Sequence, residues 1–243
     1  MHGDCLELMK TIDDKSVDMI LCDLPYGVTN CKWDTVIPFE PLWEQYNRII
    51  KDNGAIVLFG SEPFASKLRL SNLKMYKYDW VWVKNKGTNI GNSHKQPLRK
   101  SENICVFYKK QPFYVYKGEK LEKPYSHTLP IHNGSGNSTL GGCNNLTENG
   151  ERIYNTYTRK CKHNILSFPI QTKGNLHPTQ KPVALLEYLI KTYTNEGETV
   201  LDNCMGSGTT GVACKNLNRG FIGIEKDDNY FNIAKNRIEN CNS

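Results

Sequence analysis

Cys22-Asp23-Leu24-Pro25-Tyr26-Gly27 is the stretch on which the predicted fold of this 243-residue chain depends. It follows the apolar run 17–21 and ends it with an acid and a Pro-Tyr-Gly turn, which indicates a buried strand that delivers a loop. Because Leu24 precedes a proline, its backbone is biased towards the extended region and its carbonyl is expected to project. The stretch therefore predicts a loop that presents Asp23, the Leu24 carbonyl and the Tyr26 ring together.

Two hydrogen-bond acceptors beside an aromatic ring suit one kind of ligand. An exocyclic amine on a planar base has two N–H donors to satisfy and a flat face to stack. A strand end with an Asp-containing turn explains the same residues more simply, so the choice depends on the rest of the chain.

Apolar periodicity outside this stretch alternates between strand and helix. It predicts strands at 17–22, 55–59, 80–83, 104–108, 199–202 and 220–225, and helices at 6–12, 41–53, 61–73, 182–193, from 209 onward and at 227–239. Gly54 is expected to end the second of these helices. Strands that alternate with helices imply an α/β fold with a mostly parallel sheet covered on both faces.

The middle of the chain is basic. Residues 84–163 hold 14 Lys or Arg against five Glu and no Asp, a net charge of +9, and the remainder carries −3. Aromatic residues alternate with these charges, which favours a polyanionic partner, although a solvated basic surface fits as well. The candidate DNA-binding residues are Lys84, Lys86, Lys95, Arg99, Lys100, Arg159 and Lys160.

The regular alternation fails between residues 110 and 173, and residues 133–150 are rich in Gly, Asn, Ser and Thr. We therefore predict an insertion at 110–173 with a flexible loop at about 133–150, placed between domain halves at 1–109 and 174–243. A long irregular insertion with basic and aromatic flanks favours a role in recognition.

Nine cysteines are scattered without a C-x-x-C pair, and no apolar stretch is long enough to cross a bilayer. This pattern argues against a disulfide framework and against a metal site. The expectation is a soluble cytoplasmic protein with no metal and no membrane partner.

The last part of the chain has the layout of a nucleotide site. Asp202 ends a strand, Gly206-Ser207-Gly208 form a turn, Thr209 begins a helix, and Glu225 ends the next strand. Glycines let the backbone approach a ligand, the helix N-terminus attracts negative charge, and an acid in the position of Glu225 accepts from ribose hydroxyls.

Together these motifs resemble the amino-group DNA methyltransferases of the permuted beta class. Asp23-Leu24-Pro25-Tyr26 is similar to the catalytic signature Asp/Asn/Ser-Pro-Pro-Tyr, and residues 202–209 are similar to Asp-Pro-Phe-x-Gly-Ser-Gly-Thr. Gly3-Asp4, Glu102-Asn103-Ile104 and His177-Pro178-Thr179-Gln180-Lys181-Pro182 also match. Leu24 replaces the usual first proline, Asn203 and Cys204 replace Pro-Phe, and the strand before Asp4 has almost no residues.

The resemblance implies a Rossmann-like methyltransferase fold with permuted motif order and S-adenosyl-L-methionine as cofactor. It places Glu225 at the cofactor ribose, Asp202 and the glycine turn near its amino-acid part, Asp4 near its adenosine end, and His177 and Lys181 at its methionine end. The cofactor-binding candidates are Asp4, Cys5, His177, Pro178, Lys181, Asp202, Cys204, Gly206, Ser207, Gly208, Thr209 and Glu225, and the catalytic candidates are Asp23, Leu24, Pro25 and Tyr26.

The activity implied is site-specific methylation of adenine N6 in double-stranded DNA, with the base flipped out of the duplex. Methylation of cytosine N4 stays an alternative, and so does a DNA-binding protein whose methyltransferase activity has decayed. A nicotinamide-dependent oxidoreductase is disfavoured because the expected G-x-G-x-x-G is absent after Asp202. A separate restriction endonuclease as partner and the oligomeric state are left open.

Overall fold

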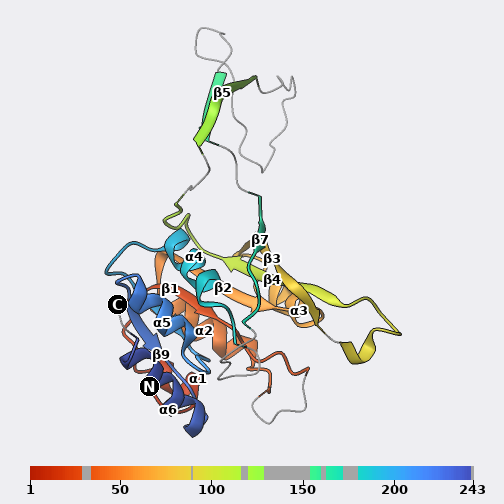
Figure 1. The fold of residues 1–243 in the computed structure, drawn as a ribbon. Helices are drawn as coiled ribbons and strands as arrows, with labels where there is room; N and C mark the ends of the chain where they lie inside the picture. The colour runs from red at the N-terminus through yellow and green to blue at the C-terminus, as the bar shows by residue number, and fades with distance from the viewer. Residues whose placement is uncertain are drawn as a thin grey trace. The chain divides into compact units, whose positions relative to one another are not determined.

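The computed structural model describes residues 1–28, 34–88, 90–115, 120–128, 154–159, 163–171 and 180–241 (Figure 1). The chain divides into two compact units. The first consists of Met1–Val115 and Asn164–Ser243, and the second of Tyr116–His163.

The first unit is built on a seven-stranded sheet in the order β7-β3-β4-β2-β1-β8-β9. The strands are β1 Val17–Cys22, β2 Ile50–Gly60, β3 Tyr76–Thr88, β4 Arg99–Phe107, β7 Ile165–Ser167, β8 Thr199–Asp202 and β9 Gly220–Gly223. β1 pairs in parallel with β2 and β8, β8 with β9, and β3 with β7, whereas β4 is antiparallel to both of its neighbours. The predicted α/β fold with a mostly parallel sheet is confirmed.

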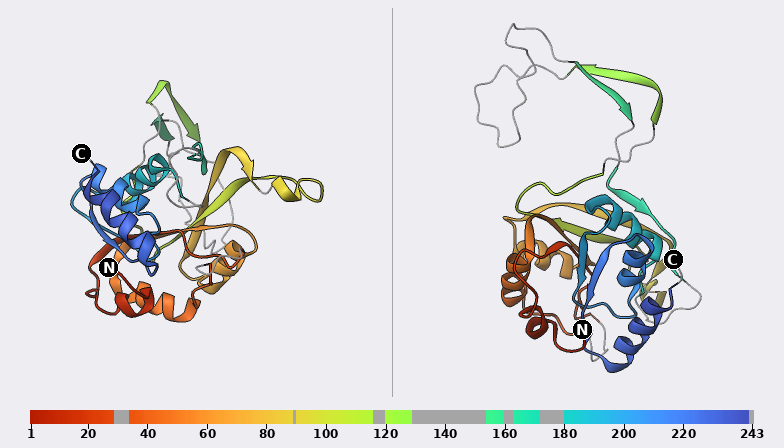
Figure 2. Two further views of the ribbon diagram at one scale, coloured as in Figure 1. Left: turned by 60° about the horizontal axis from the view of Figure 1, so that its bottom comes forward. Right: turned by 90° about the vertical axis from the view of Figure 1, so that its left-hand side faces the viewer.

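Helices cover both faces of this sheet (Figure 2). α1 Cys5–Met9, α2 Phe39–Ile49 and α3 Phe64–Ser71 pack on one face, and α4 Val183–Tyr193 and α5 Thr209–Asn216 pack on the other. α6 Asp228–Glu239 lies against α5. Side chains alternate along β1, so Ile20 and Cys22 join the first core and Met19 and Leu21 the second. This burial on both faces explains why residues 17–22 form a continuous apolar run.

Several element boundaries differ from the predicted ones, and the difference after α2 has a clear physical cause. The helix expected over 41–53 ends at Ile49, and Gly54 lies inside β2 instead of ending the helix. Ile50 takes an extended backbone and pairs with Val17 of β1, so strand pairing overrides the helical spacing of the apolar residues. A Cβ on Gly54 would lie 2.8 Å from the Asp18 carbonyl oxygen, which explains the glycine there.

The short N-terminus extends the sheet by a single bridge. His2 pairs in parallel with Glu225, and the Gly3 amide donates to the Glu225 carbonyl oxygen at 2.9 Å. The strand expected before Asp4 is therefore reduced to one residue pair, which still fixes Asp4 beside the end of β9.

The second unit contains β5 Lys120–Thr128 and β6 Tyr154–Arg159, paired antiparallel. The loop predicted at 133–150 lies outside the described residues. None of the helices in the described part of the chain is long and apolar enough to cross a membrane.

Candidate active site

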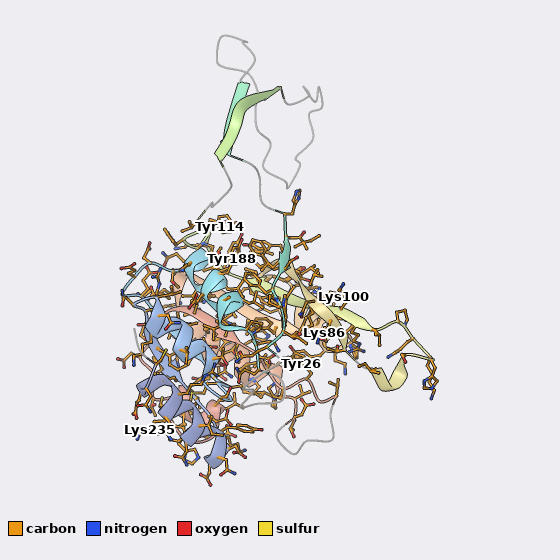
Figure 3. The ribbon with its side chains drawn as sticks, in the orientation of Figure 1. Tyr26, Lys86, Lys100, Tyr114, Tyr188 and Lys235 are labelled. Atoms are coloured by element: carbon orange, nitrogen blue, oxygen red, sulfur yellow. The ribbon has the colours of Figure 1, made fainter. Side chains whose placement is uncertain are left out.

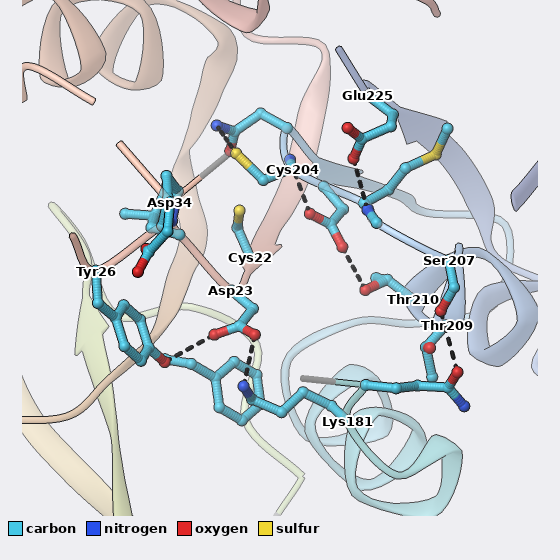
Figure 4. A pocket seen from close by; sticks show the side chains of 18 of the residues that line it. Cys22, Asp23, Tyr26, Asp34, Lys181, Cys204, Ser207, Thr209, Thr210 and Glu225 are labelled. Atoms are coloured by element: carbon cyan, nitrogen blue, oxygen red, sulfur yellow. Dashed lines mark hydrogen bonds and ion pairs between the residues drawn. The ribbon is translucent and has the colours of Figure 1, made fainter. Parts of the chain in front are cut away.

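β1, β8 and β9 run in parallel and direct their carboxyl ends to the same edge of the sheet, where a cavity of about 900 Å³ opens. Its lining includes Asp4 and Asp23 from the start of the chain and Asp202 and Glu225 from its end. Catalytic and cofactor candidates that lie about 200 positions apart in the sequence therefore share one cavity (Figure 4).

Asp23 follows β1 directly and forms the centre of a hydrogen-bonded group. Its Oδ1 accepts from the Tyr26 hydroxyl at 2.7 Å, and its Oδ2 accepts from Lys181 Nζ at 2.5 Å (Figure 4). The Tyr26 hydroxyl also lies 2.8 Å from Oε1 of Glu102, and Lys181 Nζ lies 3.2 Å from the same oxygen. Lys84 Nζ pairs with Glu102 Oε2 at 2.8 Å.

This group holds two carboxylates and two ammonium groups. Burial raises the pKa of Asp23 despite the opposing charge of Lys181, and the charge of Glu102 adds to the rise. Burial acts in the same direction on Glu102, but the charges of Lys181 and Lys84 outweigh it and bring the pKa of Glu102 down to about 2. Burial lowers the pKa of Lys181, but Asp23 and Glu102 outweigh it, so the pKa lies above its usual range. Glu102 and Lys181 are therefore charged at neutral pH, and Asp23 is the more basic of the two carboxylates.

The loop after Asp23 is fixed from several sides. The Leu24 side chain is buried in the core, and the Tyr26 ring stacks on Phe64 with 4.9 Å between ring centroids. The Asp34 carboxylate accepts from the amides of Gly27 at 2.8 Å and Val28 at 2.9 Å. These contacts hold the Asp23 and Tyr26 side chains towards the cavity, which Pro25 also lines.

Asp202 is the last residue of β8, and its carboxylate holds the turn that follows. Its carboxylate accepts from the Cys204 amide at 3.1 Å and from the Thr210 hydroxyl at 2.6 Å. Burial raises the pKa of Asp202 to about 6, against these two hydrogen bonds. The side chain lines the cavity, and its contacts shape the glycine turn between β8 and α5.

Glu225 ties this turn to the end of β9. One carboxylate oxygen accepts from the Gly206 amide at 2.8 Å, and the other accepts from the amides of Lys226 and Asp227, both at 2.9 Å. A carboxylate has about four acceptor positions, so roughly one remains for a ligand. Glu225 is thus fixed in place with limited capacity for a ligand hydroxyl.

The turn itself depends on glycine and on α6. Gly208 has a φ of +76°, and a Cβ there would lie 2.9 Å from the Cβ of Ala234 in α6. Arg237 of α6 donates to the Ser207 carbonyl oxygen at 3.1 Å and to the Thr209 hydroxyl at 3.0 Å. These contacts hold the turn against α6, with Ser207 and Thr209 on the cavity wall.

The positions that depart from the resembling motif have local explanations. Asn203 is buried, and its Oδ1 accepts from the buried Tyr46 hydroxyl at 2.6 Å. Cys204 lines the cavity together with Cys5. Asp4 caps α1 by accepting from the Leu6 amide at 3.0 Å, and Lys226 Nζ lies 3.1 Å from its other oxygen.

The sequence model of a family described as DNA methylase matches residues 17–236. The chain belongs to the DNA methylase family. Type II methyltransferase M.HpaI of Haemophilus parainfluenzae is 29% identical over 250 residues, which cover 98% of this chain and 73% of that protein. DNA adenine methyltransferase YhdJ of Escherichia coli (strain K12) is 28% identical over 255 residues, covering 98% and 82%. The solved structure of the M1.HpyAVI–SAM complex is 29% identical, covers 98% of this chain and 97% of that one, and has a TM-score of 0.63.

Several candidate residues of this DNA methylase lie differently from the expectation. Lys181 was predicted at the methionine end of the cofactor, but its Nζ binds Asp23 and Glu102. Lys84 was predicted to contact DNA, but its side chain is only 13% exposed and is held by Glu102. His177, Pro178 and Lys160 lie outside the described residues, and Arg159 lies in β6.

The remaining basic candidates of the methylase are Lys86, Lys95, Arg99 and Lys100, which we call the basic hairpin. All four are exposed on the β3–β4 hairpin, which has no acidic residue between positions 85 and 101. Figure 3 shows Lys86 and Lys100 on the two strands of this hairpin. Thr88 of β3 lines the cavity, so the hairpin begins where the cavity opens.

Sequence reasoning missed Glu102, Asp34, Thr210 and Arg237 as residues that support the site. Only Glu102 had a signal, because it stood within a motif of the resembling family. Among the described residues, no group of three or more His, Cys, Asp or Glu side chains is arranged to hold a metal ion.

Proposed function

We propose that this DNA methylase transfers a methyl group from S-adenosylmethionine to N6 of an adenine flipped out of double-stranded DNA. The observation that carries the proposal is the position of the Asp23 carboxylate, which faces the same cavity as Glu225 and the glycine turn. A base amine held at Asp23 and a methyl donor held at the glycine turn would share that cavity.

The charge of the cavity supports a cationic cofactor. Seven carboxylates and three lysines line it, so the wall carries a net negative charge. When bound, S-adenosylmethionine supplies a methyl group activated by a positive sulfonium. Glu225 would accept from its ribose, Asp4 would lie towards its adenosine end, and the turn at Gly206 and Gly208 would let the backbone approach it.

Asp23 and Leu24 orient the amine that is methylated. The lone pair of adenine N6 is delocalised into the ring, so the amine is a weak nucleophile. Hydrogen bonds from its two N–H groups to the Asp23 carboxylate and the Leu24 carbonyl would favour a tetrahedral nitrogen whose lone pair faces the methyl group. Two of the four acceptor positions of Asp23 are used by Tyr26 and Lys181, which leaves room for the amine. Asp23, as the more basic carboxylate of the site, would also receive the proton that nitrogen releases.

Tyr26 would hold the flipped base. One face of its ring packs on Phe64, and its hydroxyl is fixed by Asp23, so the ring is pre-oriented at the cavity. Stacking on an aromatic side chain is worth about 1–3 kcal/mol per base and offsets part of the cost of unstacking.

The basic hairpin would bind DNA phosphates beside the cavity, and its affinity would fall steeply with salt. The inserted region, which includes β5 and β6, is our candidate for reading base edges. The proposal also includes a separate restriction endonuclease that cuts the same site, and it places the enzyme in the cytoplasm.

Adenine is favoured over cytosine because residue 23 is an acid, whereas the catalytic motif of the cytosine-N4 enzymes more often begins with serine.

The test of this proposal separates binding from chemistry. Purified Asp23→Ala protein is compared with the wild type by calorimetric titration of S-adenosylmethionine and by transfer of a labelled methyl group to unmethylated DNA. We expect cofactor affinity within a few-fold of the wild type and no transfer. Asp52→Ala serves as a matched control, because Asp52 is an exposed carboxylate that pairs with Lys15 and Lys110 away from the cavity. An active Asp23→Ala protein would refute the assignment.

A further inference from the structure

We propose that Glu102 is a positioning residue for methyl transfer, which holds Tyr26 and Lys181 in the geometry that Asp23 needs. The inference rests on the proposed function and adds to the active site a carboxylate on β4, a strand that carries none of the predicted catalytic residues.

Glu102 contacts both side chains that bind the Asp23 carboxylate. Its Oε1 lies 2.8 Å from the Tyr26 hydroxyl and 3.2 Å from Lys181 Nζ, the same two groups that bind the two oxygens of Asp23. Its Oε2 is held by Lys84 of β3 at 2.8 Å. The side chain is 5% exposed, so these bonds are made away from bulk water and are correspondingly strong.

This arrangement divides Lys181 between two carboxylates. Asp23 and Glu102 each bind the ammonium, and the Tyr26 hydroxyl, which has one proton to donate, lies within hydrogen-bond distance of both carboxylates. Asp23 is therefore restrained through both of its oxygens by groups that Glu102 fixes. A displacement of about 1 Å at a reacting group can cost on the order of 100-fold in rate, so such a restraint bears directly on transfer.

Storage of the released proton on Glu102 is a different role, and the electrostatics disfavour it. Two lysines face its carboxylate, and its pKa of about 2 leaves it ionised at neutral pH. Asp23 has the higher pKa and is the better proton acceptor. Glu102 thus acts through its charge and its position.

The charge of Glu102 also sets the basicity of Asp23. Among the described residues, the titratable groups around Asp23 are Lys181, Tyr26, Glu102, Asp202 and Cys22. Without the Glu102 charge, Lys181 would pair with Asp23 alone, and the negative charge that repels the ionised Asp23 carboxylate would be absent. Both changes lower the pKa of Asp23. If Glu102 acts on Asp23, its loss should therefore shift the pH profile, whereas a role in the fold alone would leave the profile unchanged.

The experiment compares Glu102→Gln with the wild type in methyl transfer to DNA across pH. We expect a fall in kcat of about 10- to 100-fold. We also expect the acidic limb of kcat/KM to move to lower pH, because that limb reports the ionisation of the Asp23 carboxylate in the free enzyme. Glu102→Asp keeps the charge but shortens the reach, so its kcat should fall while the limb stays near that of the wild type.

Asp79→Asn is the control for damage to the paired strands β3 and β4. Asp79 lies on β3, is 12% exposed and pairs with Arg69 at 2.6 Å, outside the cavity lining. Its loss should leave kcat and the acidic limb close to the wild type. A wild-type enzyme without methyl transfer would overturn the proposed function itself. An active wild type with Glu102→Gln equal to it in kcat and pH profile, or with a limb that moves to higher pH, would overturn only the role of Glu102.

Discussion

Replacing Lys181 by methionine tests the charge balance of the active site. The ammonium lies between Asp23 and Glu102, and the three side chains are 9%, 24% and 5% exposed. The variant keeps the length of the side chain but leaves two neighbouring carboxylates without the cation they share. Removing one partner of a buried ion pair typically costs about 3–5 kcal/mol, so we expect the free energy of unfolding at pH 8 to fall by that amount.

The deficit should depend on pH with a definite sign. Burial already raises the pKa of Asp23, and the loss of Lys181 raises it further. A carboxyl whose pKa in the folded protein exceeds its unfolded value, about 3.8, contributes stability that is present at low pH and lost as pH rises through the folded pKa. The deficit of Lys181→Met should therefore shrink as pH falls from 8 towards 5.

Urea denaturation at pH 8 and pH 5 measures both effects. Lys226→Met is the matched control, because Lys226 pairs with Asp4 at 3.1 Å but is 77% exposed, and such surface pairs contribute at most about 1 kcal/mol. The reasoning is refuted if Lys181→Met is within the range of this control at pH 8, or if its deficit grows as the pH is lowered.

Three further predictions concern other parts of the molecule. The wild type should lose about 1 kcal/mol of stability between pH 5 and pH 7.5 as Asp202 ionises, because its pKa in the folded protein is about 6. Asp202→Asn should lack this loss, and urea denaturation at the two pH values measures the difference. Gly208→Ala should cost about 1–3 kcal/mol in the same assay because of its positive φ, whereas Gly91→Ala, with open space around it, should be near the wild type. Replacing all four residues of the basic hairpin by alanine should reduce the magnitude of the slope of log K for DNA against log salt by about 3.6, and an unchanged slope would exclude the hairpin from the DNA interface.

The local parts of the fold could be predicted from the sequence. β1 and β8 have the bounds expected at 17–22 and 199–202, because short apolar runs ended by an acid and a turn leave little choice of strand limits. The meeting of Asp23 with Asp202 and Glu225 was also predictable, since the carboxyl ends of parallel strands share one edge of the sheet.

Contacts between distant elements could not be predicted in the same way. Lys181 stands 158 positions from Asp23, and nothing local shows that its ammonium turns to a carboxylate on β1 rather than to a ligand. Lys84 belongs to a basic run and was grouped with its neighbours, but it lies on β3 two residues beyond Trp82, the residue paired with Glu102 on β4, so its ammonium reaches the buried carboxylate from the same face of the sheet. A run of charged residues predicts an exposed charged surface, whereas the partner of each charged side chain depends on the order of the strands in the sheet.

The most direct test of the central claim is nucleoside mass spectrometry on plasmid DNA from methylation-deficient cells that express this chain. N6-methyladenine should be present with the intact chain and absent with Asp23→Ala. N4-methylcytosine in its place would contradict the adenine assignment but keep Asp23 in the reaction. Soluble protein with neither base modified would contradict methyl transfer to DNA and favour a DNA-binding protein whose activity has decayed.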